Sequence, residues 1–134
     1  MQLVDTSVWI HVFRRQRTIT AIQQLLKPLI LSGNAAITEW IILELMAGIR
    51  TSEKTESFLR KMDSLPRLPF PPEKWNHAWN LAANLRKKGI SPSAADCFIS
   101  TVAISHDVPL VHRDTDFELI AKHSELRTVD WTAH

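Results

Sequence analysis

The chain has 134 residues, of which 45% are hydrophobic and 22% are charged. This length can bury a core without disulfides, and the composition excludes a disordered chain, so we expect a single globular domain over residues 1–134. The net charge of +2 excludes a protein of strongly one-sided charge. The sole cysteine, Cys97, permits no intramolecular disulfide, which favours a reducing compartment.

The sequence shows no feature typical of a membrane or secreted protein. Its longest uncharged stretches, residues 28–38 and 97–106, are shorter than the roughly 18 apolar residues of a membrane-spanning helix. The first residues lack the basic segment and apolar core of a signal peptide. We therefore expect a cytoplasmic protein with no membrane partner.

Short apolar runs alternate with segments of helical periodicity along the chain. In chain order, strands are expected at residues 2–4, 35–37, 68–70, 108–111 and 126–129. Helices are expected at 8–15, from Thr18 or Thr20 to Gly33-Asn34 with a break near Pro28, at 38–48, at 52–65 with Phe58, Leu59 and Met62 inward, at 71–89, from Ser91-Pro92 to about 105, and at 116–122. This alternation predicts an α/β fold with a mostly parallel central sheet flanked by helices.

Five acidic residues follow or interrupt apolar segments. They are Asp5, Glu44, Asp96, Asp114 and Asp116. A charge among apolar neighbours must be paired, neutralised or bound to a metal, and five charges of one sign cannot pair with one another. Glu44 carries this argument furthest, because no other charge lies between Glu39 and Arg50 and little water is expected around it. A shared divalent cation would resolve the conflict.

The predicted topology allows these acids to converge. In an open parallel sheet, functional residues lie beyond the carboxyl ends of the strands. Asp5 ends the first strand, Asp114 follows a later one, and Asp96 lies in the first turn of its helix. Each acid also has a structural alternative: Asp5 could cap a helix, Asp96 could complement a helix dipole, and Asp114 could belong to a turn. Thr6 and Ser7 could be caps or could orient Asp5.

A carboxylate cluster suits Mg²⁺ or Mn²⁺, which prefer oxygen ligands. Such ions hydrolyse phosphodiesters with a metal-activated water, and no Ser-His-Asp or Cys-His set is evident as an alternative. Setting the five acids aside from the net charge of +2 leaves about +7 on the rest of the chain. This charge lies in three basic clusters, which suit a polyanion or are simply solvated helix faces: Arg14, Arg15 and Arg17; Lys54, Arg60 and Lys61; and Arg86, Lys87 and Lys88.

Four segments, at residues 4–10, 44–49, 96–103 and 112–117, resemble the four motifs of PIN-domain ribonucleases, and among these the VapC toxins of type II toxin–antitoxin modules. The resemblance implies an endoribonuclease that depends on Mg²⁺ or Mn²⁺ and cleaves tRNA or rRNA. It also implies a homodimer and a hetero-oligomer with a cognate antitoxin protein. By motif, the metal-binding catalytic quartet is Asp5, Glu44, Asp96 and Asp114, with Asp116 as a fifth metal position.

The sequence departs from this family at two positions. His112 stands where many relatives have a small hydroxyl residue, and Asp107 stands where glycine is common. His112, beside Arg113, is expected to be at most a phosphate contact. The departure at His112 leaves the conformation of the fourth-motif loop open.

Two other functions were weighed against the ribonuclease. An aspartate-phosphorylating receiver or phosphatase-like domain also places an acid after the first strand. The phosphatase would need a second aspartate where Ser7 stands, and the receiver would need paired acids and a late lysine that are not evident. A non-catalytic partner-binding module would not need Glu44 among apolar residues. The ordered set of acids favours the ribonuclease.

Overall fold

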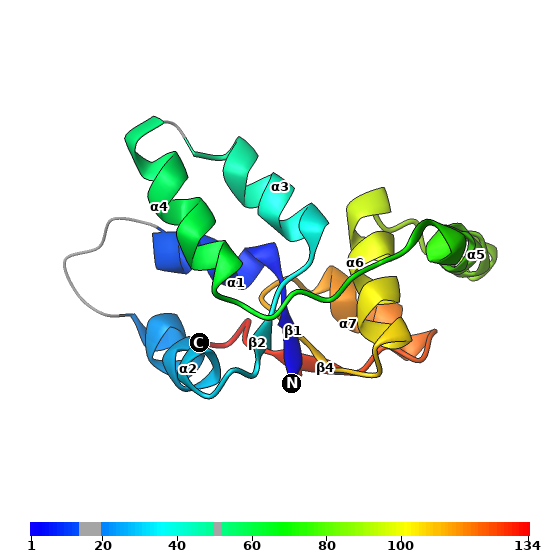
Figure 1. Cartoon of the computed structure of the whole chain (residues 1–134). Coiled ribbons are helices and arrows are strands. Elements are labelled where there is room, and N and C mark those ends of the chain that lie inside the picture. The colour runs from blue at the N-terminus through cyan, green and yellow to red at the C-terminus, as the bar shows by residue number, and fades with distance from the viewer. Residues whose placement is uncertain (14–19, 50–51) are drawn as a thin grey trace.

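The computed structural model describes residues 1–13, 20–49 and 52–134 (Figure 1). The strands are β1 (Gln2–Val4), β2 (Ala35–Ala36), β3 (Leu110–His112) and β4 (Thr128–Asp130). The helices are α1 (Thr6–Phe13), α2 (Ala21–Leu31), α3 (Glu39–Ala47), α4 (Ser52–Asp63), α5 (Trp75–Lys87), α6 (Ala94–Ser105) and α7 (Asp116–Lys122), with a 3-10 turn at Pro72–Lys74. The predicted basic cluster of Arg14, Arg15 and Arg17 lies outside the described residues.

The strands form one parallel sheet in the order β2-β1-β3-β4. β1 lies at its centre, where Leu3 pairs with Ala36 on one side and Leu110 on the other. The ladder continues past the end of β1, because Asp5 N–H donates to the Val111 carbonyl at 2.9 Å. The prediction of an α/β fold with a parallel sheet is confirmed, and the sheet fixes Asp5 beside the carboxyl end of β3.

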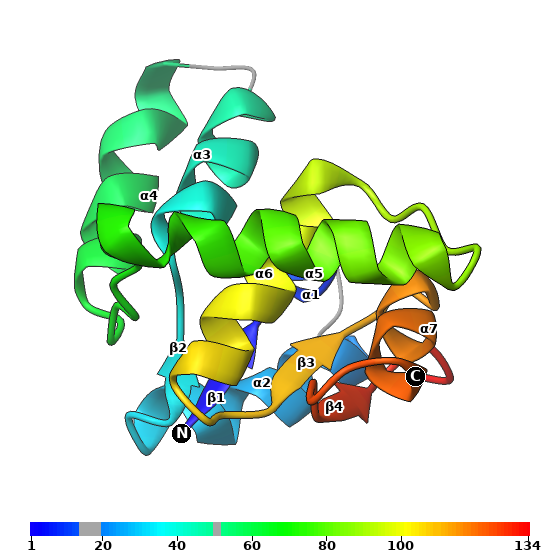
Figure 2. The ribbon, with the colours of Figure 1, turned by 90° about the vertical axis from the view of Figure 1, so that its right-hand side faces the viewer.

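Helices cover both faces of the sheet. Figures 1 and 2 show α5, α6 and α7 on one side, with α1 and α2 on the other. In both views α3 and α4 stand together beyond the carboxyl ends of the strands. That edge of the sheet therefore lies near α3, the start of α6 and the segment that follows β3.

The core is densest along α6 and the two central strands. Leu3 and Val4 in β1 and Leu110 and Val111 in β3 are fully buried, which explains why these strands read as continuous apolar runs. Every residue of α6 from Cys97 to Ala103 is buried as well. The middle of this helix is therefore enclosed on nearly all sides, whereas its first turn, which carries Asp96, is only partly buried.

The predicted strand at residues 68–70 is wrong. Only an isolated bridge forms there, between Ile37 and Arg67, with Ile37 N–H bonded to the Pro66 carbonyl and Leu68 N–H bonded to the Ile37 carbonyl. The prolines at 66, 69 and 71 have no N–H to donate, so a strand ladder cannot extend through them.

Three predicted helix boundaries also differ from the structure. α1 begins at Thr6 instead of Val8, so Thr6 and Ser7 lie inside the helix. α2 continues through Pro28 to Leu31 instead of breaking there, because its buried residues Ile22 and Leu26 anchor the helix to the core despite the missing N–H. The helix expected to start at Ser91-Pro92 begins at Ala94. Its N-cap is Ser93, whose hydroxyl accepts a hydrogen bond from Asp96 N–H.

α4 is amphipathic, as expected, but its inward face is narrower than predicted. Phe58 and Met62 are buried, whereas Leu59 is 40% exposed and does not face the core. Within the described residues, no helix combines the length and apolar character needed to cross a bilayer.

Candidate metal centre

The predicted acids lie around the carboxyl edge of the sheet. Asp5 directly follows β1, and Asp114 lies two residues after the end of β3. Asp96 is the third residue of α6, and Asp116 is the first residue of α7. Glu44 comes from α3, which packs against α1 and α6. The ends of β1 and β3 and the helices α3, α6 and α7 thus bring carboxylates to the same edge of the sheet, as the predicted topology indicated.

Three of these carboxylates form a compact group. One carboxylate oxygen each from Asp96, Asp114 and Asp116 can be chosen so that all three lie within 4.8 Å of one another. Asp96 and Asp114 are half-buried and Asp116 is exposed, so the group opens to solvent on one side. Oxygen atoms at this spacing could act as ligands of a single hard cation. We call Asp96, Asp114 and Asp116 the acidic triad.

Asp5 is the most enclosed of the five acids, with 5% of its surface exposed. Its Oδ2 accepts hydrogen bonds from the Ser7 hydroxyl at 2.6 Å and from the Ser7 N–H at 3.0 Å. Burial raises the pKa of Asp5, and the hydrogen bonds from Ser7 oppose that rise. Asp5 therefore also binds the first turn of α1, as one structural alternative held, and Ser7 orients its carboxylate.

The strongest electrostatic perturbation is at Asp96, whose pKa is raised to about 6. Partial burial is the largest cause, followed by the negative charges of Asp114 and Asp5. The Ser93 hydroxyl acts in the opposite direction. Burial and acidic neighbours both disfavour the ionised form of this carboxyl group. A bound metal ion would compensate this negative charge.

Glu44 differs from its prediction. The residue is exposed, so the argument that it lacks water is wrong. The apolar sequence around it does not enclose it, since neighbouring Leu43 is itself 59% exposed. Its Oε1 accepts a hydrogen bond from the Thr6 hydroxyl at 2.9 Å. Partial burial of the carboxyl group raises its pKa, the Thr6 bond lowers it, and the charge of Asp5 raises it further.

The premise that all five acids sit in apolar surroundings therefore holds only for Asp5. Asp96 and Asp114 are half-buried, and Glu44 and Asp116 are exposed. The carboxylates of Asp5 and Glu44 lie outside the acidic triad. Asp5 is nevertheless close enough to raise the pKa values of both Asp96 and Glu44. The charge of Asp5 thus acts both on a member of the triad and on Glu44 in α3.

Sequence reasoning missed the contacts that join the first and fourth motifs. The Ser7 hydroxyl, which donates to Asp5, also accepts from Arg113 N–H at 2.9 Å. The Arg113 side chain donates to the backbone carbonyls of Trp131 and His134 and contacts His11. No local sequence pattern predicts the contacts of Arg113 with Ser7 and His11, because they join segments more than 100 residues apart.

The fourth motif contains a second surprise, at His112. Its side chain is fully buried, so it does not offer even the phosphate contact that was the most expected of it. The Nδ1 atom accepts a hydrogen bond from Asp114 N–H at 3.1 Å, and the Nε2 atom lies 2.8 Å from Glu118 Oε1. An unpaired histidine at the end of an apolar strand was the available signal, since a buried imidazole needs partners for both nitrogens.

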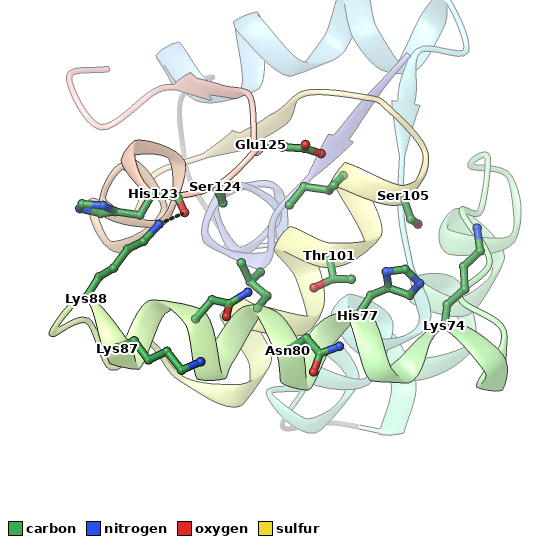
Figure 3. A pocket seen from close by; sticks show the side chains of 13 residues that line it. Lys74, His77, Asn80, Lys87, Lys88, Thr101, Ser105, His123, Ser124 and Glu125 are labelled. Atoms are coloured by element: carbon green, nitrogen blue, oxygen red, sulfur yellow. Dashed lines mark hydrogen bonds between the residues drawn. The ribbon is translucent and has the colours of Figure 1, made fainter.

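A surface pocket of about 670 Å³ lies apart from these acids, between α5, the C-terminal half of α6 and the segment after α7 (Figure 3). Lys74, Lys88 and His123 are among its lining residues, and Lys88 Nζ donates to the His123 carbonyl at 3.3 Å. None of the five predicted acids lines it. The candidate metal centre is therefore the cluster of acids at the sheet edge and not this pocket.

The fold and the clustered acids define a parallel α/β protein with a carboxylate site suited to a divalent cation. The family model "PIN domain" matches residues 3–123. The chain is 30% identical over 135 residues to ribonuclease VapC11 of Mycobacterium tuberculosis, covering 98% of this chain and 99% of that protein. It is 32% identical over 100 residues to ribonuclease VapC3 of Methanocaldococcus jannaschii, covering 75% and 95%.

A solved structure of DNA-bound VapBC from Salmonella typhimurium shares the fold, with a TM-score of 0.75 at 21% identity and 98% and 99% coverage. The chain therefore belongs to the PIN-domain family, and within it is related to the VapC ribonucleases. This assignment leaves the receiver and phosphatase readings without support. In the structure, Asp5 is 5% exposed and its Oδ2 accepts two hydrogen bonds from Ser7.

Proposed function

We propose that this chain is a divalent-cation-dependent endoribonuclease, the toxin of a type II toxin–antitoxin module. The observation that carries the proposal is the acidic triad at the carboxyl edge of a PIN-domain sheet, with Asp5 and Glu44 beside it. The substrate is RNA, with tRNA or rRNA as the expected target. A cytoplasmic location follows, because these RNAs are found there.

The donor set fits Mg²⁺ or Mn²⁺. All candidate ligands are carboxylate oxygens, and no cysteine lies among them. Asp96, Asp114 and Asp116 would hold the ion, with Asp5 and Glu44 bordering it. When bound, such an ion supplies Lewis-acid activation of water and neutralises charge on the scissile phosphate.

Neighbouring side chains orient the acids that border the candidate metal centre. Ser7 fixes the Asp5 carboxylate through two hydrogen bonds, and Thr6 holds Glu44 through one. Both donors lie in the first turn of α1, so one helix start orients acids from two different motifs. The carboxylates also repel a phosphodiester unless a cation is present, which makes cleavage conditional on metal.

The test is RNA cleavage by purified protein with EDTA, and then with Mg²⁺ or Mn²⁺ restored. We expect cleavage only with the cation, and a loss of at least about a hundredfold in Asp5→Asn and Asp96→Asn with the fold retained. Asp107→Asn is the matched control. Its carboxylate is 95% exposed, and Asn tolerates its positive φ of 51° and can still accept from Arg127.

Wild-type activity in folded Asp5→Asn or Asp96→Asn, free of contaminating nuclease, would remove these residues from the catalytic set. Cleavage that persists in EDTA would instead remove the cation from the proposal. Loss of activity in Asp107→Asn as well would show that the assay detects general damage to the protein and not the specific loss of Asp5 or Asp96.

A cognate antitoxin protein and a second copy of the chain are the proposed partners. The solved structures that share the fold include toxin–antitoxin complexes. A small reading frame beside this one should encode the antitoxin, and its co-expression should suppress cleavage. Light scattering of the purified toxin should give a mass near twice 15.3 kDa for the homodimer.

A further inference from the structure

The imidazole of His112 bridges the fourth-motif loop to the body of the domain. It ends β3 and is fully buried, with its ring 5.3 Å from that of Phe117. One ring nitrogen faces the loop that carries Asp114, and the other faces α7. A side chain enclosed in this way has one available orientation, so its two hydrogen bonds are set by the fold.

The direction of these bonds fixes where the ring proton lies. Asp114 N–H is a donor, so the Nδ1 atom of His112 must accept with its lone pair. The proton of the neutral ring therefore sits on Nε2, which donates to Glu118 Oε1 at 2.8 Å.

A third residue completes the set, because the Thr128 hydroxyl in β4 donates to the same Glu118 oxygen. Glu118 Oε1 thus accepts hydrogen bonds from both Thr128 and His112. The resulting chain of bonds runs from β4 through α7 to the loop after β3. It therefore ties the loop to α7 and to the edge strand β4.

The far end of this chain reaches the acidic triad. The Asp114 N–H is held by His112, and one Asp114 oxygen, Oδ1, accepts from Asp116 N–H at 3.0 Å. The Asp114 carbonyl also accepts from Phe117 N–H at 3.1 Å. With both main-chain groups and one carboxylate oxygen engaged, the remaining Asp114 oxygen has little freedom.

We propose that His112 is a positioning residue which, together with Glu118 and Thr128, sets the Asp114 carboxylate for cation binding. This inference rests on the proposed function, since it concerns the same metal centre. It also explains how this chain does without the small hydroxyl residue expected at position 112. A neutral imidazole supplies the acceptor for the loop N–H, and Glu118 supplies the anchor that fixes the imidazole.

The first test measures Mn²⁺ affinity of the purified protein by calorimetry, with no RNA present. His112→Leu removes the acceptor and should weaken binding about tenfold or more. His112→Asn restores an acceptor that can reach a backbone N–H two residues on, and should recover affinity to within about threefold of wild type. His106→Leu is the matched control. Its ring bonds the Pro69 carbonyl at 2.7 Å at the opposite end of α6 from Asp96, so it should leave affinity unchanged.

A second pair of variants addresses the anchor and decides the matter if His112→Leu fails to fold. Glu118→Gln keeps an oxygen that accepts from both His112 and Thr128, and should bind Mn²⁺ within about threefold of wild type. Glu118→Ala leaves Nε2 without its acceptor, and should lose about tenfold. Equal losses in both variants would point to the charge of Glu118 and overturn its role as an anchor.

The third readout is the ring proton itself. Nitrogen-15 chemical shifts of the cation-free protein should show His112 protonated on Nε2 and not on Nδ1, and Glu118→Ala should reduce that preference. A proton on Nδ1 in wild type, or wild-type Mn²⁺ affinity in folded His112→Leu, would overturn the inference. If the wild type binds Mn²⁺ but cleaves no RNA, the proposed function fails while the positioning role is still decided. If His112→Leu binds Mn²⁺ and cleaves RNA like wild type, only the positioning role fails.

Discussion

Asp96 is the acidic residue whose pKa is influenced by the most of its acidic neighbours. Partial burial of its carboxyl group, followed by the charges of Asp114 and Asp5, raises its pKa to about 6. Without a cation the ionised form of Asp96 is thus destabilised, and either a proton or a metal ion would neutralise its charge. Protons and divalent cations should therefore compete for this residue below about pH 6.

This competition predicts how stability depends on pH. Because the pKa of Asp96 is raised in the folded state, the folded protein binds this proton more tightly than the unfolded chain, and the free energy of unfolding falls as pH rises from 3.8 to about 6. Asp96→Asn should remove that loss and stabilise the cation-free protein at pH 7.5 by about 1 kcal/mol, after discounting for the half-exposed site. Urea unfolding in EDTA at pH 5 and pH 7.5 measures it. A less stable Asp96→Asn at pH 7.5 would contradict the assignment.

Glu44 gives a second prediction at the residue scale. Partial burial and the charge of Asp5 both raise its pKa, so its negative charge does not stabilise the cation-free fold. Glu44→Gln keeps an oxygen for the Thr6 hydroxyl and should leave the free energy of unfolding in EDTA unchanged or higher by up to about 1 kcal/mol. Thermal melting without metal checks this. A clear drop in Tm would assign Glu44 a structural role.

At the scale of the elements, the start of α6 couples helix stability to the candidate metal centre. The Ser93 hydroxyl accepts from Asp96 N–H at 3.1 Å and lowers the pKa of Asp96. Ser93→Ala should cost about 1 kcal/mol of stability and raise the pKa of Asp96 further. Ser91→Ala is the control, because among the described residues Ser91 makes no hydrogen bond that caps this helix. Urea unfolding and carboxyl carbon-13 titration measure the two effects, and equal results for both variants would refute the coupling.

The elements also show what a sequence can reveal. Asp5 and Asp96 were predictable because β1 and α6 are nearly continuous apolar runs, and each acid interrupts such a run at a boundary that topology places at the sheet edge. The exposure of Glu44 was not predictable, because an apolar helix does not reveal which of its sides faces water. The start of α6 was placed too early because Pro92 suggested a first helical position, whereas the capping hydrogen bond comes from Ser93.

Other parts of the site depend on tertiary contacts that no local pattern encodes. The bond from Arg113 N–H to Ser7 joins the fourth motif to the first, and the bonds of Glu118 join α7 to both β3 and β4. Such contacts emerge only when parallel strands far apart in the sequence become neighbours. Family motifs can locate ligand residues, but the residues that orient them are found in the structure.

At the scale of the whole molecule, the sheet, the helices and the charges serve one arrangement. The order β2-β1-β3-β4 places the ends of β1 and β3 side by side, and α3, α6 and α7 bring the remaining acids to that edge. The net charge of the chain is nevertheless +2, so the five acids belong to a chain whose remaining charge is basic. This distribution suits a polyanion that is attracted by the surface and reacts only where a cation neutralises the acids.

The central claim is that the acidic triad is a divalent-cation site. Its most direct test is the anomalous scattering of Mn²⁺ in crystals of the wild-type protein grown or soaked with that ion. We expect an anomalous peak within coordinating distance of Asp96 and Asp114, with Asp116 beside it, and no such peak in Asp96→Asn. A peak found only at another place, or one that persists unchanged in Asp96→Asn, would contradict the account.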